Sequence, residues 1–185
     1  MTIHTSYRSA AMALGLAGLA ACSPPPQKAA QPPVAAGAPA HSETQKRNLA
    51  NFDDLDFRVY SGQKWDELHK SHAQDILVHY PDGSTTTGLP DHVERLKPQF
   101  VFAPDTVIRE HPIKLADGDL TAVQGFMEGT FSQPMDLGNG KVIQPTGKKF
   151  KLGMVTIGRW ENGVMKEEWL FWDNAAFMKQ IGVAP

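Results

Sequence analysis

Residues 148–173, KKFKLGMVTIGRWENGVMKEEWLFWD, contain the strongest structural signal in the chain. Two strand-like runs, 148–160 and 164–172, flank Asn162 and Gly163. Asn-Gly is the favoured pair for a two-residue type I′ turn, so the stretch predicts an antiparallel hairpin.

Upstream of this hairpin the sequence changes from helical to strand-like periodicity. Helices are predicted over 47–60, 66–75 and 91–100, a short strand over 76–80, a second hairpin over 105–115 and 119–131, and a terminal helix after Asp173. Helices followed by a long antiparallel sheet define an α+β arrangement. A twisted sheet of this length curls around the helices, and a cavity is expected between the two layers.

The first 21 residues resemble an export signal, with Arg8 before an apolar run at 10–21. Leu19-Ala20-Ala21-Cys22 resembles the lipobox of bacterial lipoproteins, and Cys22 is the single cysteine of the chain. The lipobox predicts a lipid anchor on Cys22, and Ser23 after it favours the outer membrane, facing the periplasm. A plain secretory signal that ends near a cysteine is the alternative.

Residues 22–47 are rich in proline and alanine and contain no aromatic side chain. Such a segment cannot bury enough apolar surface to offset its conformational entropy, so we expect a flexible stalk. The sequence is therefore divided into a signal peptide at 1–21, a stalk at 22–47 and one folded domain at 48–185.

The overall charge excludes some classes of partner. A net charge of −2 and a pI near 6.4 provide no basic field for a phosphate backbone, so nucleic-acid binding is not expected. No apolar run reaches the ~20 residues of a membrane-spanning helix. The sequence leaves open whether the domain forms a homodimer.

Several motifs resemble those of the SnoaL-like polyketide cyclases, which belong to the nuclear transport factor 2-like superfamily. They are Arg159-Trp160-Glu161-Asn162-Gly163, Glu167 to Asp173, Gln180-Ile181-Gly182, Asp75 to Gly83, Gly129-Thr130-Phe131 and Pro145 to Lys148. The likeness runs from about 50 to 183. It implies a cone-shaped α+β fold, in which a curved antiparallel sheet wraps around N-terminal helices and a central pocket.

The resemblance also implies a chemistry, because these cyclases close a ring by an intramolecular aldol reaction with an aspartate as acid/base and no cofactor. Asp173 matches that aspartate best. The usual Glu-His-Trp of the last strand is Glu167-Glu168-Trp169 here, so the histidine is absent. A helix N-cap is the alternative role for Asp173, and one residue can fill both.

Strand period places Glu167, Trp169, Phe171 and Asp173 on one face of the hairpin, which we expect to line the pocket. Glu167, Trp169 and Phe171 are therefore candidate substrate-binding residues, and a carboxyl group on this face would be desolvated, with a raised pKa. The opposite face is the alternative, and a bulge would exchange the two.

Two histidines are candidate proton carriers beside Asp173. His79 precedes a turn at the expected mouth of the cavity, and His92 opens the next helix. His72 and Tyr80 are expected to line the pocket and bind substrate. For each histidine a surface or structural role is the alternative.

His111 lies two residues after Arg109 on a predicted strand, where the pair could bind an acid group of a substrate. A solvated strand face is the alternative. The spacing of His69, His72 and His79 with Asp75 resembles metal ligation, but the apolar stripe around His72 favours a core or pocket histidine, so neither a metal nor an organic cofactor is predicted.

Two functions remain for the domain. The first is a cofactor-independent cyclase or isomerase that uses acid/base catalysis on a small hydrophobic, polyketide-like carbonyl compound in an enclosed pocket. The second is a non-catalytic lipoprotein of the cell envelope that binds a small apolar ligand. A buried Asp173 beside a histidine would favour the enzyme, and a purely apolar pocket would favour the binding protein.

Overall fold

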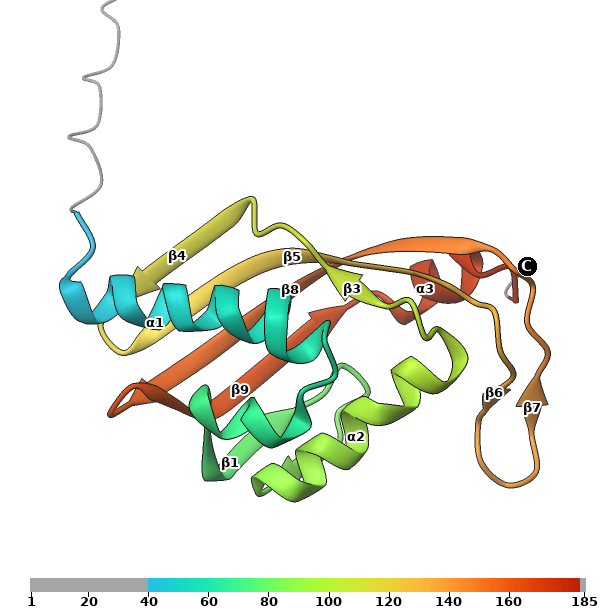
Figure 1. Ribbon diagram of the computed structural model, residues 1–185, viewed down its shortest axis with the longest axis horizontal. Coiled ribbons are helices and arrows are strands. Elements are labelled where there is room, and N and C mark those ends of the chain that lie inside the picture. The colour runs from blue at the N-terminus through green and yellow to red at the C-terminus, as the bar shows by residue number, and fades with distance from the viewer. Residues whose placement is uncertain (1–39, 184–185) are drawn as a thin grey trace, which may run out of the picture. The chain divides into compact units, whose positions relative to one another are not determined.

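The computed structural model describes residues 40–183, whose arrangement is shown in Figure 1. The helical elements are α1 (Glu43–Asp54), the π-helical η1 (Leu55–Tyr60), the 3₁₀-helical η2 (Trp65–Lys70), α2 (Leu89–Phe102) and α3 (Asn174–Gln180). The strands are β1 (His72–His79), β2 (Thr85–Thr87), β3 (Val107–Ile108), β4 (Ile113–Asp117), β5 (Leu120–Thr130), β6 (Met135–Asp136), β7 (Val142–Ile143), β8 (Lys149–Glu161) and β9 (Val164–Trp172). The expected signal peptide and Cys22 lie outside the described residues.

The main sheet has the strand order β2-β1-β9-β8-β5-β3, with β4 also paired to β5. The long strands β5 and β8 curve across the domain, and α3 lies against β8 (Figure 1). The α+β fold with a curved sheet confirms the expected fold class. Within residues 40–183, no helix is both long and apolar enough to cross a membrane.

The hairpin predicted from Asn162-Gly163 is present, and both residues have the positive φ angles, 51° and 86°, of a type I′ turn. Glu161 pairs with Val164 and Trp160 with Met165. A bulge then shifts the register between Arg159 and Trp160. From Arg159 onward, away from the turn, each residue of β8 pairs with a β9 residue one position further along the chain than an unbroken ladder would give. A shift of one residue exchanges the two faces of a strand.

The sheet is mixed and not purely antiparallel, which corrects the prediction. β1 runs parallel to β9, with Val78 beside Glu168 and His79 beside Trp169. A parallel pair needs a long connection, and the chain between β1 and β9 is long enough to form α2 and seven strands, β2 to β8, before it returns. Hairpin signals cannot reveal such a pair, because its two strands are not neighbours in sequence.

The helix predicted over 66–75 ends at Lys70, and a strand begins at His72. The helical spacing of apolar residues continues past this point, but the backbone joins the sheet instead, where Met165 N–H donates to Ser71 O at 2.7 Å. Tertiary pairing therefore overrides local periodicity here.

The first helix begins at Glu43, before the expected domain boundary at 48, because Ser42 caps it through the Gln45 backbone N–H. Its apolar stripe is buried as expected and continues to Val59 in η1, while Phe57 is partly exposed. The buried side chains of the domain form two clusters, and Met154 and Trp172 pack against both.

Candidate functional site

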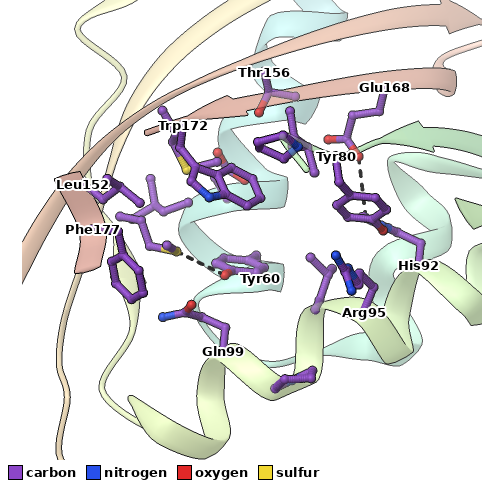
Figure 2. A pocket seen from close by; sticks show the side chains of 18 of the residues that line it. Tyr60, Tyr80, His92, Arg95, Gln99, Leu152, Thr156, Glu168, Trp172 and Phe177 are labelled. Atoms are coloured by element: carbon purple, nitrogen blue, oxygen red, sulfur yellow. Dashed lines mark hydrogen bonds and ion pairs between the residues drawn. The ribbon is translucent and has the colours of Figure 1, made fainter. Parts of the chain in front are cut away.

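A pocket of about 330 Å³ lies between the two hydrophobic clusters. Most of its wall is apolar, and Figure 2 shows side chains from η1, α2 and the sheet converging on it. Three carboxyl groups interrupt the apolar wall. Asp82 is about half exposed and paired with Arg95. Asp56 from η1 and Glu168 from β9 are shielded from solvent, and each belongs to its own group of polar side chains.

The first polar group consists of Glu168, His72 and His92, all buried. Glu168 Oε2 lies 3.7 Å from His72 Nε2 and 3.6 Å from His92 Nε2. Both distances are too long for a hydrogen bond. Glu168 Oε2 and His72 Nε2 also make no hydrogen bond to any other described residue. Glu168 lies on β9, His72 on β1 and His92 on α2, so the fold brings together residues from three different elements.

The opposite ring nitrogen of each histidine is held in place. His72 Nδ1 contacts Ser71 Oγ at 2.8 Å and Leu68 O at 3.3 Å. His92 Nδ1 and the Tyr80 hydroxyl are hydrogen-bonded at 2.8 Å. Both imidazole rings are therefore oriented with Nε2 toward Glu168.

Burial determines the charge of His92, lowering its pKa to about 4, although the nearby Glu168 carboxylate acts in the opposite direction. His92 is therefore neutral at pH 7. For Glu168, burial alone would raise the pKa, but attraction to His72 and His92 outweighs it and holds the pKa below its usual range. Glu168 is accordingly an ionised carboxylate inside an apolar pocket.

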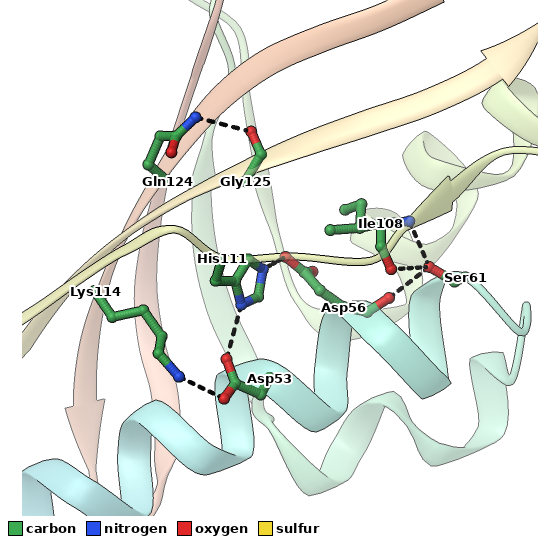
Figure 3. Close-up of polar contacts among 8 residues, drawn as sticks. All are labelled: Asp53, Asp56, Ser61, Ile108, His111, Lys114, Gln124 and Gly125. Atoms are coloured by element: carbon green, nitrogen blue, oxygen red, sulfur yellow. Dashed lines mark hydrogen bonds and ion pairs between the residues drawn. The ribbon is translucent and has the colours of Figure 1, made fainter.

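The second polar group runs from the pocket toward the surface (Figure 3). His111 Nε2 lies 2.9 Å from Asp56 Oδ2, and His111 Nδ1 lies 2.8 Å from Asp53 Oδ1. Lys114 Nζ then donates to Asp53 Oδ2 at 2.6 Å. Burial raises the pKa of Asp56, and this outweighs its hydrogen bond to His111. The pKa of His111 is raised because its two carboxylate partners outweigh its own burial.

Of the residues predicted from the sequence, His72, Tyr80 and His92 line this pocket. His72 does so from a strand and not from the predicted helix. Their proposed roles in substrate binding and proton transfer stay predictions.

His79, Glu167, Trp169 and Phe171 do not line the pocket, which corrects the expected placement. His79 Nε2 lies 2.9 Å from Glu167 Oε1, and its ring stacks on Trp169, on the face of the sheet opposite Glu168. The side chain of Phe171 is half exposed. The bulge at Arg159 and Trp160 is the physical reason, because it exchanges the faces of β9 beyond Met165.

Asp173 is exposed and does not line the pocket either. Its side chain accepts a hydrogen bond from the Ala176 backbone N–H at 3.0 Å and caps α3, as the alternative interpretation expected. The His111 side chain is buried against Asp53 and Asp56, so it is not on a solvated strand face. Arg109 is exposed and pairs with Glu128 instead, so the two side chains do not share one acid-binding site.

Sequence reasoning missed Asp56 and Glu168, the two carboxyl groups of the pocket that are shielded from solvent. Glu168 occupies the place of the family histidine, and this substitution was the available signal. No comparable signal marked Asp56, which lies among other acidic residues of the first predicted helix. A π-helical segment widens the helix where Asp56 faces the pocket, and such segments are frequent at functional sites.

Comparison with known proteins agrees with this architecture. The model of the SnoaL-like polyketide cyclase family matches residues 57–181, and the chain belongs to this family. A search of curated protein sequences finds no match.

Among solved structures, a candidate SnoaL-like polyketide cyclase from Jannaschia sp. CCS1 is similar with a TM-score of 0.69 and 19% identity, over 80% of this chain and 100% of that one. The candidate polyketide cyclase IdmH from Streptomyces antibioticus has a TM-score of 0.63 and 21% identity, over 74% and 99%. AclR from Streptomyces galilaeus, a candidate hydroxylase, has a TM-score of 0.61 and 18% identity, over 76% and 82%. At such identities the likeness defines the fold and leaves the reaction open.

Proposed function

We propose that the domain catalyses an acid/base isomerisation or ring closure of a small apolar carbonyl compound, with Asp56 as the general base. Asp56 would take a proton from the carbon next to the carbonyl group and return it elsewhere on the same molecule. The observation that carries this proposal is a mostly buried carboxyl group, 15% exposed, with a raised pKa in the wall of an apolar pocket. A base whose pKa approaches the working pH is the kind that transfers protons efficiently.

His111 supports this role of Asp56, because it orients the carboxylate through Oδ2 at 2.9 Å. The charge on His111 is balanced by Asp53 on its other side. The resulting chain of polar groups reaches Lys114, which is about one-third exposed. A proton held at Asp56 thus has hydrogen-bonded groups between it and solvent.

Tyr60 supplies a suitable partner for the substrate oxygen. Its hydroxyl faces the pocket near Met127 Sδ, 3.4 Å away, which is a weak acceptor (Figure 2). Burial, with a smaller effect from Asp56, raises the pKa of Tyr60 far above its usual value. Tyr60 therefore keeps its proton and can donate a hydrogen bond to the enolate oxygen that forms as Asp56 removes a proton.

The substrate class follows from the pocket. A volume of about 330 Å³ is at the lower end of the range for small-molecule sites, and its wall is mainly Leu, Met, Phe and Trp. The family membership and the resemblance to polyketide cyclases favour a compact polyketide-like compound.

The test has two stages. Mass spectrometry of small molecules that co-purify with the chain identifies a ligand, and turnover of that ligand is then compared between the parent and Asp56→Asn. Asparagine keeps the shape of the side chain but cannot accept the proton, so we expect turnover to fall by roughly 10²-fold or more. Asp173→Asn, outside the pocket, is the matched control. A parent that binds the ligand without converting it would replace this proposal with the non-catalytic binding protein.

We also propose that the chain is exported and anchored in the cell envelope through a lipid on Cys22. The support is the apolar run that ends in Leu19-Ala20-Ala21-Cys22. Cys22→Ser removes the thiol that accepts the lipid and should release the protein from the membrane fraction. Equal membrane association of the parent and the Cys22→Ser variant would disprove the anchor.

A further inference from the structure

The group formed by His72, His92 and Glu168 contains buried polar atoms without hydrogen-bond partners in the described part of the chain. Two of its facing atoms, His72 Nε2 and Glu168 Oε2, are buried and have no hydrogen-bond partner among the described residues. Leaving such atoms unsatisfied is destabilising, and more so for a charged group. The gap between them is also too wide for a direct hydrogen bond.

The hydrogen bonds of His72 define which of its nitrogens carries a lone pair. Nδ1 faces the carbonyl oxygen of Leu68, which can only accept, so the proton of a neutral ring belongs on Nδ1. In that tautomer Nε2 presents a lone pair toward the Glu168 carboxylate, 3.7 Å away. A cation between the two atoms would contact both.

We propose that His72, His92 and Glu168 bind one divalent transition-metal ion, with an open coordination position that faces the pocket. Two imidazole nitrogens and one carboxylate oxygen are a ligand set typical of zinc and non-haem iron sites that keep a position for substrate. The three donor atoms lie within 4.8 Å of one another. The pocket reaches all three residues, so the fourth position is accessible to a ligand.

The distances agree with such a site. Atoms bonded to zinc at about 2.0–2.2 Å in a tetrahedral arrangement lie roughly 3.4 Å apart. The observed separations from Glu168 Oε2 are 3.7 Å to His72 and 3.6 Å to His92. These two separations would need to shorten only slightly to hold an ion, and the two histidine nitrogens lie within 4.8 Å of each other.

The surroundings of the two histidines are those of metal ligands, because each ring is fixed by its non-coordinating nitrogen. With an ion on each Nε2, His72 Nδ1–H would donate to Leu68 O and Ser71 Oγ, and His92 Nδ1–H would donate to the Tyr80 hydroxyl. The Tyr80 hydroxyl in turn contacts Thr86 Oγ1 at 3.1 Å. Such partners fix the tautomer and raise the basicity of the coordinating nitrogen.

Two other histidines of the domain, His111 and His79, differ from this group because their ring nitrogens are hydrogen-bonded to carboxylates. His111 is bonded through both ring nitrogens, to Asp53 and Asp56, and His79 Nε2 is bonded to Glu167. Their coordinating positions are occupied by the protein itself. The metal ligands assigned here also differ from the set His69, His72, His79 and Asp75 considered from sequence spacing, because only His72 is shared.

The inference goes beyond the proposed proton transfer by Asp56 and does not depend on it. An ion with an open position toward the pocket would polarise a carbonyl oxygen of a bound compound as a Lewis acid. Binding of the ion is measured without any substrate, so failure of one proposal leaves the other intact.

The experiment uses the full chain with Cys22→Ser, so that no thiol competes for the ion, purified without a polyhistidine tag and stripped with a chelator. Zn²⁺ is added as the probe, and binding is followed by titration calorimetry and by thermal unfolding. We expect one ion per chain and a rise in Tm of roughly 5 °C or more at a hundredfold excess over Kd. A parent that binds no Zn²⁺ overturns the proposal.

Variants then locate the ion. In the same background, His92→Ala and Glu168→Gln should weaken Zn²⁺ binding by roughly 100-fold or more, because each removes a ligand, and Tyr80→Phe by about 10–100-fold, because it removes a partner of a ligand. His79→Ala is the matched control, since it removes a histidine on the opposite face of the sheet, and should bind as the parent does. Equal affinity of the parent, His92→Ala and Glu168→Gln would place the ion elsewhere and overturn the proposal.

A readout on the parent covers the case in which a ligand variant does not fold. X-ray absorption of the Zn²⁺-loaded parent should show two imidazole ligands, with nitrogen and oxygen neighbours at about 2.0–2.2 Å. A spectrum with one imidazole or none contradicts the assignment, whatever the variants do.

Discussion

His111 and His92 are both buried histidines beside carboxylates, yet their surroundings give them opposite properties. His111 contacts Asp56 and Asp53 at 2.9 and 2.8 Å, and these partners raise its pKa. His92 lies 3.6 Å from Glu168 without a hydrogen bond to it, and burial lowers its pKa to about 4. The surroundings of His111 favour the charged ring between two carboxylates, whereas His92 is neutral at pH 7 and makes no hydrogen bond to its carboxylate.

The difference teaches that the number and distance of the carboxylates, and not the mere presence of one, decide which form of a buried histidine is favoured. Hydrogen-bond distance favours the charged ring strongly enough to outweigh desolvation, whereas a gap of under one ångström more lets desolvation win. A satisfied network such as that of His111 suits orientation and proton transfer. A group with unsatisfied polar atoms, such as the one that contains His92, suits the binding of a metal ion.

The largest effect is expected from breaking the satisfied network. His111→Ala leaves Asp56 and Asp53 facing a void, and removal of one partner from a buried ion pair costs about 3 kcal/mol or more of unfolding free energy. Urea unfolding at pH 6 measures this cost. Lys114→Ala removes the more exposed end of the same chain of contacts and should cost under about 1 kcal/mol. Equal losses would mean that His111 is neutral and contributes little through its charge.

A second effect separates the two histidines by the sign of their pH dependence, and for His92 it amounts to about 3 kcal/mol spread over a pH range. The unfolded chain protonates a histidine near pH 6.5, but folded His92 resists protonation until about pH 4. Stability from neutral His92 is therefore present above pH 6.5 and is lost as pH falls from 6.5 to 4. His111 has a raised pKa, so its contribution is present below pH 6.5 and is lost as pH rises through its folded pKa.

Urea unfolding across pH, with a chelator present, tests this opposition. The stability difference between the parent and His92→Gln should shrink toward low pH, and that between the parent and His111→Gln should shrink toward high pH. Two difference curves with the same slope would contradict the comparison.

The smallest effect is expected at Asp173, a carboxylate outside both groups. Asp173→Ala removes the cap of α3 and should cost about 1 kcal/mol, whereas Asp173→Asn should cost almost nothing, because asparagine caps equally well. Thermal unfolding of both variants measures this. A cost of several kcal/mol for Asp173→Asn would contradict the capping role alone and would mean that the charge of Asp173 also stabilises the fold.

Much of the fold could be predicted from the sequence because its signals are local. Asn162-Gly163 specified a type I′ turn, and the alternating residues around it specified two long strands. The apolar stripe from Leu49 to Val59 likewise specified the first helical segment. The predicted pocket residues His72, Tyr80 and His92 were also found in the pocket wall.

What the sequence by itself determined is therefore the set of elements and the α+β class, since turn chemistry and periodicity act over a few residues. Only the tertiary structure decided which face of β9 is inside, because that depends on a single bulge between Arg159 and Trp160, and a register shift of one residue has no marker in composition. It also brought Glu168 to His72 and His92, from a parallel pair of strands and a helix far apart in sequence. The chemistry of the pocket arises from these long-range contacts, and local sequence patterns cannot encode them.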